Sequence, residues 1–232
     1  MTYTISVRLS IIALLLLAPL AACAQTICID PGHPSEVGRG TTGKKISELT
    51  AAWKIAKLLE AKLKAAKLTV VLTKDAEETF VKNKDRSAVA NKAKADLMVR
   101  LHCDANEGGG FAVYVPMQQG TSGGKTGPSE EVIASSTEKG KLFHTELAKH
   151  LKGKLKDNGL LGDIKTAVGA KQGALTGSIY SEVPVVLVEM CCLTNAKDEE
   201  FMASKEGQEA MAEALFKATK AALAGTKKAT AL

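Results

Sequence analysis

Two histidines and a glutamate stand at the far ends of three apolar runs in this sequence. His33 follows the run 26–29 across the turn signal Asp30-Pro31-Gly32, while His102 and Glu189 end runs that begin at residues 95 and 183. The runs are rich in β-branched and aliphatic residues, which is typical of buried strands. Open α/β sheets hold catalytic groups at the carboxyl ends of their strands. The pattern therefore predicts an active site built by three strand ends.

The types of these side chains suggest metal chemistry. His33 and His102, joined by one carboxylate, would make a three-ligand site with an open position, the arrangement that catalytic zinc uses. Glu48 is the candidate carboxylate, because it begins a predicted helix on the side of the loop that carries His33. The residues leave a second interpretation open, in which Glu48 only places a favourable charge at a helix N-terminus.

Burial of the Glu189 carboxylate at its predicted position would be energetically unfavourable. A carboxylate at the end of an apolar strand must find a partner or a function that offsets its desolvation. Beside a metal site it could act as a general base toward water. The alternative is a buried ion pair with a lysine or an arginine.

Alternating strands and helices are expected to position these residues. Helical periodicity predicts helices over 46–67, 83–94, 130–156 and 206–224, and apolar runs predict strands over 26–29, 68–73, 96–102, 111–115 and 185–189. Residues 120–128 are predicted as a flexible surface loop and 157–159 as a turn. The order predicts an α/β fold, with a mostly parallel twisted sheet and helices on both faces.

Residues 1–24 have the features of a secretory signal peptide. Arg8 precedes an apolar run, 11–18, that is too short to span a bilayer. Small residues around Ala22-Cys23-Ala24 allow cleavage before Gln25, while Leu20 to Cys23 resembles the lipobox of bacterial lipoproteins. We therefore expect a catalytic domain over 25–224 and a tail over 225–232, in the periplasm or cell envelope. A lipid on Cys23 is the one membrane attachment that we consider.

The composition limits the partners. The net charge of +6 on 232 residues permits attraction to anionic polymers. No basic run is interleaved with aromatic residues, so we expect no nucleic-acid partner, and we expect a monomer.

Other polar and sulfur-bearing residues have less demanding interpretations. Four cysteines, Cys28, Cys103, Cys191 and Cys192, are expected to be small buried side chains. Cys103 and Cys191 could approach each other if their strands are neighbours. His144 and His150 do not share a helix face, so surface positions are expected.

The order of these motifs resembles the zinc-dependent N-acetylmuramoyl-L-alanine amidases of bacterial cell walls, from about Thr26 to Ala224. Asp30-Pro31-Gly32-His33 matches the motif of the family's first zinc ligand, and Glu48 falls where its glutamate ligand lies. Residues 101–105 resemble the segment of the second histidine ligand. Residues 184–189 match Pro-x-x-Leu-x-Glu, which ends in the catalytic glutamate.

The resemblance implies a specific chemistry. It implies a phosphorylase/hydrolase-like α/β fold in which His33, Glu48 and His102 hold Zn²⁺ and Glu189 is catalytic. Peptidoglycan would be the substrate, cut at the amide between N-acetylmuramic acid and L-alanine. A protein activator, the preferred glycan and the preferred stem peptide stay open.

Several residues depart from the family pattern. Pro34-Ser35 replaces Gly-Gly after the first histidine, Arg100 replaces a common serine, and Cys191-Cys192 replaces Gly-Phe. Many members carry an arginine shortly before the proline of the last strand, where this chain has Ile179-Tyr180-Ser181. The rim of the site is therefore expected to differ, and the carbonyl-polarising arginine is expected to be either missing or supplied from elsewhere in the chain.

Two other functions compete with this interpretation. A zinc carboxypeptidase-like peptidase is disfavoured because its usual His-x-x-Glu ligand pair is absent. A non-catalytic peptidoglycan-binding lipoprotein is disfavoured because the chain keeps all three ligand residues and Glu189.

Overall fold

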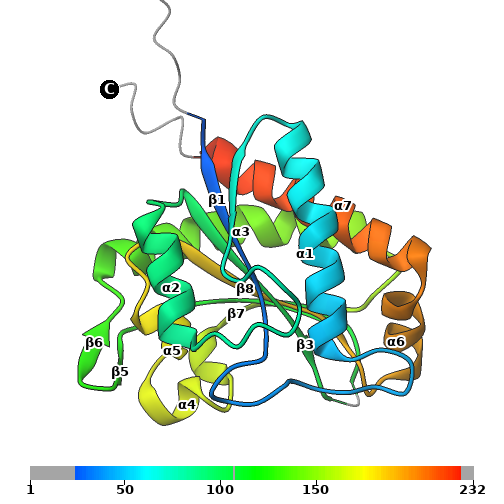
Figure 1. Cartoon of the computed structure of the whole chain (residues 1–232), viewed down its shortest axis with the longest axis horizontal. Coiled ribbons are helices and arrows are strands. Elements are labelled where there is room, and N and C mark those ends of the chain that lie inside the picture. Colours follow the sequence, from blue (N-terminus) through cyan, green and yellow to red (C-terminus); the bar gives the residue numbers. More distant parts are fainter. Residues whose placement is uncertain (1–23, 107, 226–232) are drawn as a thin grey trace, which may run out of the picture.

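A six-stranded sheet forms the centre of the computed structural model, which describes residues 24–106 and 108–225 (Figure 1). Its strand order is β2-β1-β3-β8-β4-β7. The strands are β1 Thr26–Pro31, β2 Thr69–Leu72, β3 Leu97–Asp104, β4 Phe111–Val115, β7 Asp157–Gly162 and β8 Val185–Cys192. Every neighbouring pair is parallel except β4 and β8. The predicted mostly parallel α/β fold is confirmed. Residues 1–23 of the predicted signal peptide and 226–232 of the predicted tail lie outside the described residues.

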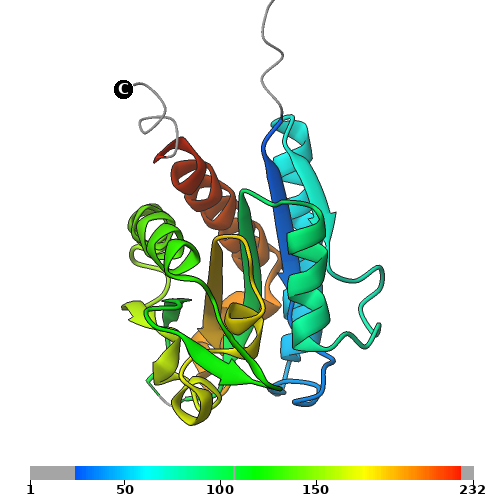
Figure 2. The same cartoon turned by 90° about the vertical axis from the view of Figure 1, so that its left-hand side faces the viewer.

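Helices cover both faces of this sheet (Figure 2). Side chains alternate between the faces of a strand, so Ile27 and Ile29 join the larger core while Cys28 joins the smaller one. The larger core lies under α1 Glu48–Ala65, α3 Glu130–Leu151 and α7 Lys205–Ala224. The smaller core lies under α2 Asn83–Lys92. The remaining helical segments are η1 Asp163–Lys165, α4 Gly169–Gln172, α5 Thr176–Ile179 and α6 Ala196–Ala203.

Two segments differ from their predicted structure. Residues 120–128, predicted as a flexible loop, contain an antiparallel hairpin of β5 Gly120–Ser122 and β6 Lys125–Gly127. Gly123 and Gly124 both have positive φ, as tight hairpin turns require. Residues 157–159, predicted as a turn, begin β7. This strand lies at an edge of the sheet, where polar residues such as Asp157 and Asn158 are tolerated.

The structure also tests the predictions about the cysteines and the two helical histidines. Because β3 and β8 are neighbours, Cys103 and Cys191 do approach, with 3.8 Å between their Sγ atoms and no disulfide. His144 and His150 are partly exposed, and their imidazoles bond to Asp157 and Glu146 respectively. In the described part of the chain, no helix is long and apolar enough to cross a membrane.

Candidate metal centre

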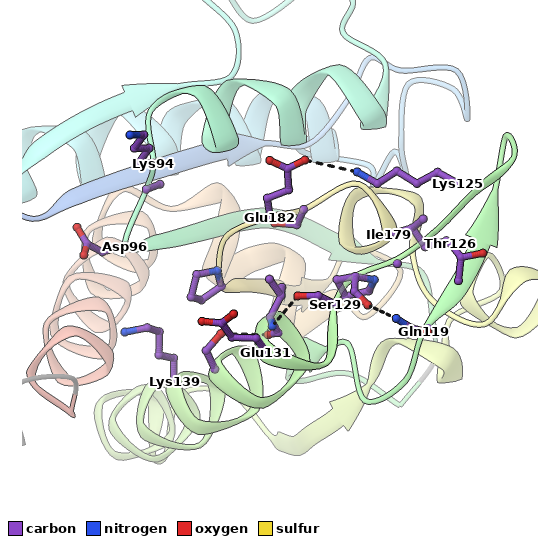
Figure 3. A pocket seen from close by; sticks show the side chains of 17 residues that line it. Lys94, Asp96, Gln119, Lys125, Thr126, Ser129, Glu131, Lys139, Ile179 and Glu182 are labelled. Atoms are coloured by element: carbon purple, nitrogen blue, oxygen red, sulfur yellow. Dashed lines mark hydrogen bonds and ion pairs between the residues drawn. The ribbon is translucent and has the colours of Figure 1, made fainter. Parts of the chain in front are cut away.

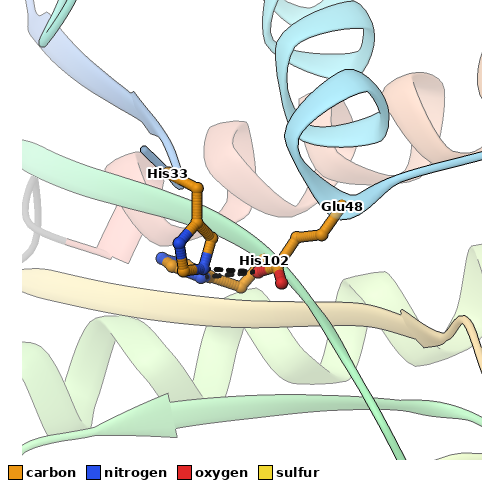
Figure 4. Close-up of side chains that lie close together, drawn as sticks. All are labelled: His33, Glu48 and His102. Atoms are coloured by element: carbon orange, nitrogen blue, oxygen red, sulfur yellow. Dashed lines mark hydrogen bonds and ion pairs between the residues drawn. The ribbon is translucent and has the colours of Figure 1, made fainter. Parts of the chain in front are cut away.

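Three side chains from separate elements meet at the carboxyl edge of the sheet (Figure 4). His33 follows β1, Glu48 is the first residue of α1, and His102 lies in β3. Glu48 Oε1 lies 3.2 Å from His33 Nε2 and 2.9 Å from His102 Nδ1. One donor atom from each residue lies within 4.8 Å of the other two. The structure thus brings together the three residues predicted as ligands.

His33 is held by the turn that follows β1. Gly32 N donates to Leu101 O at 2.9 Å, which ties the turn to β3. His33 adopts a φ of 53°, in the left-handed region that histidine enters more often than most residues. Its Nδ1 lies 3.0 Å from the carbonyl oxygen of Gly38, which can only accept a hydrogen bond. Nδ1 therefore carries the proton, and Nε2, which faces Glu48, is the nitrogen available to a metal.

Glu48 is turned into the protein rather than toward solvent. Ser47 caps α1 by accepting a hydrogen bond from Thr50 N at 3.1 Å, which fixes where the helix begins. The Glu48 carboxylate then accepts from the backbone N–H groups of Thr41 at 2.8 Å and Cys103 at 3.2 Å. Glu48 is only 3% exposed. A charge that merely favoured the helix N-terminus would have no need of this burial.

Two glycines leave room for the rings. A Cβ on Gly32 would come within 2.6 Å of the His102 ring. A Cβ on Gly40 would come within 2.5 Å of Glu48 Oε2 and 2.7 Å of His33 Cδ2. Gly40 also has a φ of +82°. The loop between β1 and α1 can close around the three side chains only because these positions lack a side chain.

The charges of the three groups depend on one another. Burial alone would raise the pKa of Glu48, but hydrogen bonds with His102 and His33 hold the pKa of this carboxyl well below its usual range. Burial lowers the pKa of His102, which keeps it a neutral imidazole. For His33, burial is outweighed by the hydrogen bond and charge of Glu48, so the pKa of His33 lies above its ordinary value.

The donor set fits a zinc ion. His102 faces Glu48 Oε1 through Nδ1 at 2.9 Å, and its other ring nitrogen, Nε2, is buried with no hydrogen-bond partner among the described residues. An orphaned ring nitrogen of this kind is costly unless something outside the protein satisfies it. Two imidazoles and a carboxylate are ligands of the kind that catalytic zinc takes, with a further position left open.

Glu189 stands beside this set. It pairs in register with His102 across β3 and β8, and β8 continues past it to Cys192 rather than ending there as predicted. Its Oε2 is buried without a hydrogen-bond partner, and it forms no ion pair within the described residues. Burial, followed by the charges of Glu48 and Asp104, raises the pKa of Glu189 well above its ordinary value. The predicted alternative of a buried ion pair is therefore wrong.

Two hollows meet at Glu189. One, of about 200 Å³, is lined by His33, Arg100, His102 and Glu189 together with the segments 166–168 and 175–177. The other, of about 180 Å³, is lined by Asp104, Tyr114, Lys156 and Glu189 among others. A substrate could therefore extend to both sides of this carboxylate.

Arg100 is a site residue that sequence analysis noted only as a departure. It is the only lysine or arginine among the described residues that line the 200 Å³ hollow. Its Nε donates to Asp30 Oδ2 at 2.8 Å, and its Nη2 donates to Asn83 Oδ1 at 2.6 Å. The segment 179–181 offers no cation in its place. A charged residue inside an apolar strand was the signal that could have identified it.

Asp30 anchors the turn from below. It is fully buried and accepts hydrogen bonds from Arg86 Nη1 at 2.7 Å, from Arg100 Nε and from Thr73 Oγ1 at 2.5 Å. Burial alone would raise its pKa, but the charges of Arg86 and Arg100 hold the pKa of Asp30 well below its usual range. This aspartate therefore holds the turn rather than contributing to the metal centre.

Comparison with known proteins gives one consistent picture. Residues 27–221 match the family described as N-acetylmuramoyl-L-alanine amidase. The chain is 30% identical over 174 residues to the N-acetylmuramoyl-L-alanine amidase LytC of Bacillus subtilis, a match that covers 75% of this chain and 30% of LytC. It is 28% identical over 186 residues to the endolysin of Bacillus phage SPP1, covering 79% of this chain and 60% of the endolysin. The chain thus spans less than two thirds of either relative.

Solved structures share its fold. The catalytic domain of CwlV, an N-acetylmuramoyl-L-alanine amidase from Bacillus (Paenibacillus) polymyxa, superposes with a TM-score of 0.68 at 24% identity, over 86% of this chain and 98% of that one. The N-acetylmuramyl-L-alanine amidase Ami1 of Mycobacterium smegmatis gives a TM-score of 0.71 at 20% identity, over 87% of this chain and 97% of that one.

Proposed function

The chain belongs to the N-acetylmuramoyl-L-alanine amidase family, and on that premise we propose that it hydrolyses the amide between N-acetylmuramic acid and L-alanine in peptidoglycan. The observation that carries the proposal is the meeting of His33, Glu48 and His102 beside a buried, unpartnered Glu189. A structural role alone would not account for four costly polar groups gathered at one edge of the sheet.

His33, Glu48 and His102 are the residues that would hold zinc. When bound, zinc supplies Lewis acidity that activates water and polarises a carbonyl. His33 would bind through Nε2, because its Nδ1 is engaged by Gly38 O. The backbone donors of Thr41 and Cys103 orient the Glu48 carboxylate, and its hydrogen bonds with His102 and His33 hold its pKa well below the usual range.

Glu189 is the proposed general base. Its raised pKa makes it a stronger proton acceptor than an ordinary carboxylate, and its Oε2 has no protein partner that competes for the proton. It would take a proton from the attacking water and deliver it to the amine of L-alanine as the amide bond breaks. One residue can serve both steps because the proton leaves it in the second.

Arg100 is the proposed source of positive charge beside the scissile bond. It lines the same hollow as His102 and Glu189. Its bonds to Asp30 and Asn83 hold the guanidinium in place before substrate arrives. A preorganised cation of this kind stabilises negative charge that develops on a carbonyl oxygen.

We further propose that the mature chain acts in the periplasm or cell envelope. Support comes from Arg8 and the short apolar run 11–18, followed by small residues up to Ala24. The catalytic domain would span 25–224. Both a released chain beginning at Gln25 and a lipid-anchored chain beginning at Cys23 agree with this signal.

The test is digestion of purified peptidoglycan by the zinc-loaded protein, followed by mass spectrometry. An amidase releases intact stem peptides with a free L-alanine amine and leaves glycan strands without peptide. A carboxypeptidase would instead shorten the stem peptides from their carboxyl ends. Sedimentation of the protein with peptidoglycan, with neither product formed, would support a binding protein and contradict the proposal.

A further inference from the structure

A third and larger cavity, of about 660 Å³, lies at the opposite edge of the sheet (Figure 3). Asp96, which precedes β3, and Pro184, which precedes β8, both line it. The first turns of α3 and strand β6 also line the cavity. Asp96 and His102 are six residues apart along an extended chain, which places this cavity about 20 Å from the metal centre. None of the five residues given a role in the proposed activity, Arg100 included, lines it.

Lys139 is the unusual residue of this cavity. It projects from α3, is 5% exposed, and its Nζ is buried with no hydrogen-bond partner among the described residues. Burial lowers the pKa of this amine. Buried polar groups nearly always have partners, and a buried ammonium without one is strongly unfavourable. The charges of Asp96 and Glu138 act on Lys139, but no carboxylate of the described chain forms a hydrogen bond with its Nζ, so a place for a hydrogen-bonded anionic partner is left open.

The other charges of the cavity restrict what that partner can be. The lining holds three lysines and three carboxylates: Lys94, Lys125, Lys139, Asp96, Glu131 and Glu182. Lys125 and Glu182 pair with each other at 3.7 Å. Asp96 Oδ2 accepts a hydrogen bond from Thr26 N at 2.7 Å, and Figure 3 shows Asp96 and Lys139 on the same side of the cavity.

Both signs of charge thus face a ligand in this cavity. A purely anionic ligand would be repelled by Asp96 and Glu131, and a purely cationic one by Lys139. Val132 and Ile179 add an apolar part to the lining. A molecule that carries a carboxylate, an ammonium and a small apolar part complements all of these groups.

We propose that this cavity binds a small zwitterion, an amino acid or a short peptide. Its carboxylate pairs with Lys139 Nζ, and its ammonium faces Asp96 or Glu131. A charge-assisted bond to a buried ammonium supplies most of the specificity. The proposal goes beyond the amidase function and shares no residue with it.

Calorimetric titration with alanyl-alanine tests the proposal. The wild-type protein should bind this dipeptide. Alanyl-alanine amide lacks the carboxylate and N-acetyl-alanyl-alanine lacks the ammonium, so both should bind at least about tenfold more weakly. Lys139→Met should weaken dipeptide binding to the same extent. The control Lys141→Met alters an exposed lysine of the same helix and should leave binding unchanged.

Thermal unfolding gives a second readout. Without ligand, Lys139→Met should unfold at the same or a higher temperature, because it removes an unpaired buried charge. It should also lose the rise in unfolding temperature that the dipeptide gives the wild type. The analogue series on wild type decides the same question should the variant not fold.

Two results would overturn the proposal. One is that alanyl-alanine does not bind the wild type, whether or not inorganic phosphate does, and the other is equal binding of alanyl-alanine and its amide. None of these measurements uses peptidoglycan hydrolysis, so they are independent of the proposed activity.

Discussion

Glu48 and Glu189 are two carboxylates near the same histidine, yet their surroundings shift their pKa values in opposite directions. Burial opposes ionisation in both. Glu48 overcomes it through hydrogen bonds with His102 and His33, so its pKa falls. Glu189 has no such compensation and lies near the charges of Glu48 and Asp104, so its pKa rises. Carboxylates separated in this way suit different tasks, here the proposed metal ligand and the proposed proton acceptor.

Glu189→Gln should separate metal binding from turnover. The amide keeps the size of the side chain but cannot take a proton, so the variant should fold and hold zinc while turnover falls roughly 10²–10⁴-fold. The measurement is release of free stem peptide beside zinc content from metal analysis. Near wild-type rates would show that the general-base assignment is wrong, even if the protein is an amidase.

Substitution of a proposed ligand residue should lower zinc content as well as activity, unlike Glu189→Gln. Glu48→Gln, His33→Ala and His102→Ala should lose zinc and activity together, because neutral amides and methyl groups are poor zinc ligands. A chelator should abolish activity of the wild type and lower its unfolding temperature, since a bound metal stabilises the folded state. One zinc per wild-type chain is expected. A fully active protein purified without zinc would contradict the metal assignment.

Residue types alone were enough to nominate His33, His102 and Glu189, because histidine and glutamate at the ends of apolar runs have few inexpensive explanations. Glu48 begins a predicted helix, where a favourable terminal charge was an equally simple explanation, and only the resemblance to the amidase family favoured its role as a ligand. Arg100 could not be assigned in the same way. Its position on the hollow depends on Asp30 and Asn83, which come from two other segments. A contact between distant segments leaves no periodic pattern in the sequence.

The loop between β1 and α1 is the element that shapes the metal centre. Because a Cβ on Gly40 would overlap Glu48 and His33, Gly40→Ala should lower zinc affinity at least about tenfold while the fold persists. Gly124→Ala is the matched control, since Gly124 has nearly the same φ, +80° against +82°, but open space around it. Both substitutions place a Cβ on a residue with a left-handed φ, so both carry backbone strain of the same kind. Zinc titration of both proteins separates strain from overlap, and equal affinities would contradict the role of Gly40.

The buried ion pair between Asp30 of β1 and Arg86 of α2 should set the acid sensitivity of the fold. The pKa of Asp30 is held below its unfolded value, so the unfolded chain binds a proton that the folded chain does not. The stability from this group is complete above about pH 4 and is lost as the pH falls through the folded-state pKa, by up to about 1.4 kcal/mol per pH unit.

Asp30→Asn tests this ion pair. It should lower stability at pH 7 by about 3–5 kcal/mol, because Arg86 and Arg100 lose their partner. It should also lose stability less steeply than the wild type between pH 4 and pH 3. Urea unfolding at several pH values measures both effects, and parallel pH profiles would contradict the assignment.

Apolar strands could be predicted, including the edge strand β2, whereas β7 and the β5–β6 hairpin could not. The strand 111–115 was predicted with the bounds that the structure has, because aromatic and β-branched residues favour strands and Gly110 and Pro116 bound the run. β7 and the β5–β6 hairpin begin with polar or glycine-rich residues that are also typical of loops. Their strand character comes from pairing with other segments, which local composition does not encode.

At the scale of the whole molecule, the predicted signal peptide has a direct test. Mass spectrometry of the native mature protein should find its first residue at Gln25, or at Cys23 carrying lipid. Detergent phase separation should place only the lipid-bearing form in the detergent-rich phase. A chain that retains Met1 in the soluble cytosolic fraction would contradict both.

The direction in which β1 runs decides which way the protein would face. Its first residue, Thr26, lies at one edge of the sheet, and its last leads into the turn of His33 at the other, about 20 Å away for a strand of this length. A lipid on Cys23 would thus fasten the molecule by the edge remote from its metal centre. The edge with the candidate metal centre would face away from the bilayer, and the anchored protein would reach only the peptidoglycan nearest the membrane. A released chain could diffuse through the whole peptidoglycan layer.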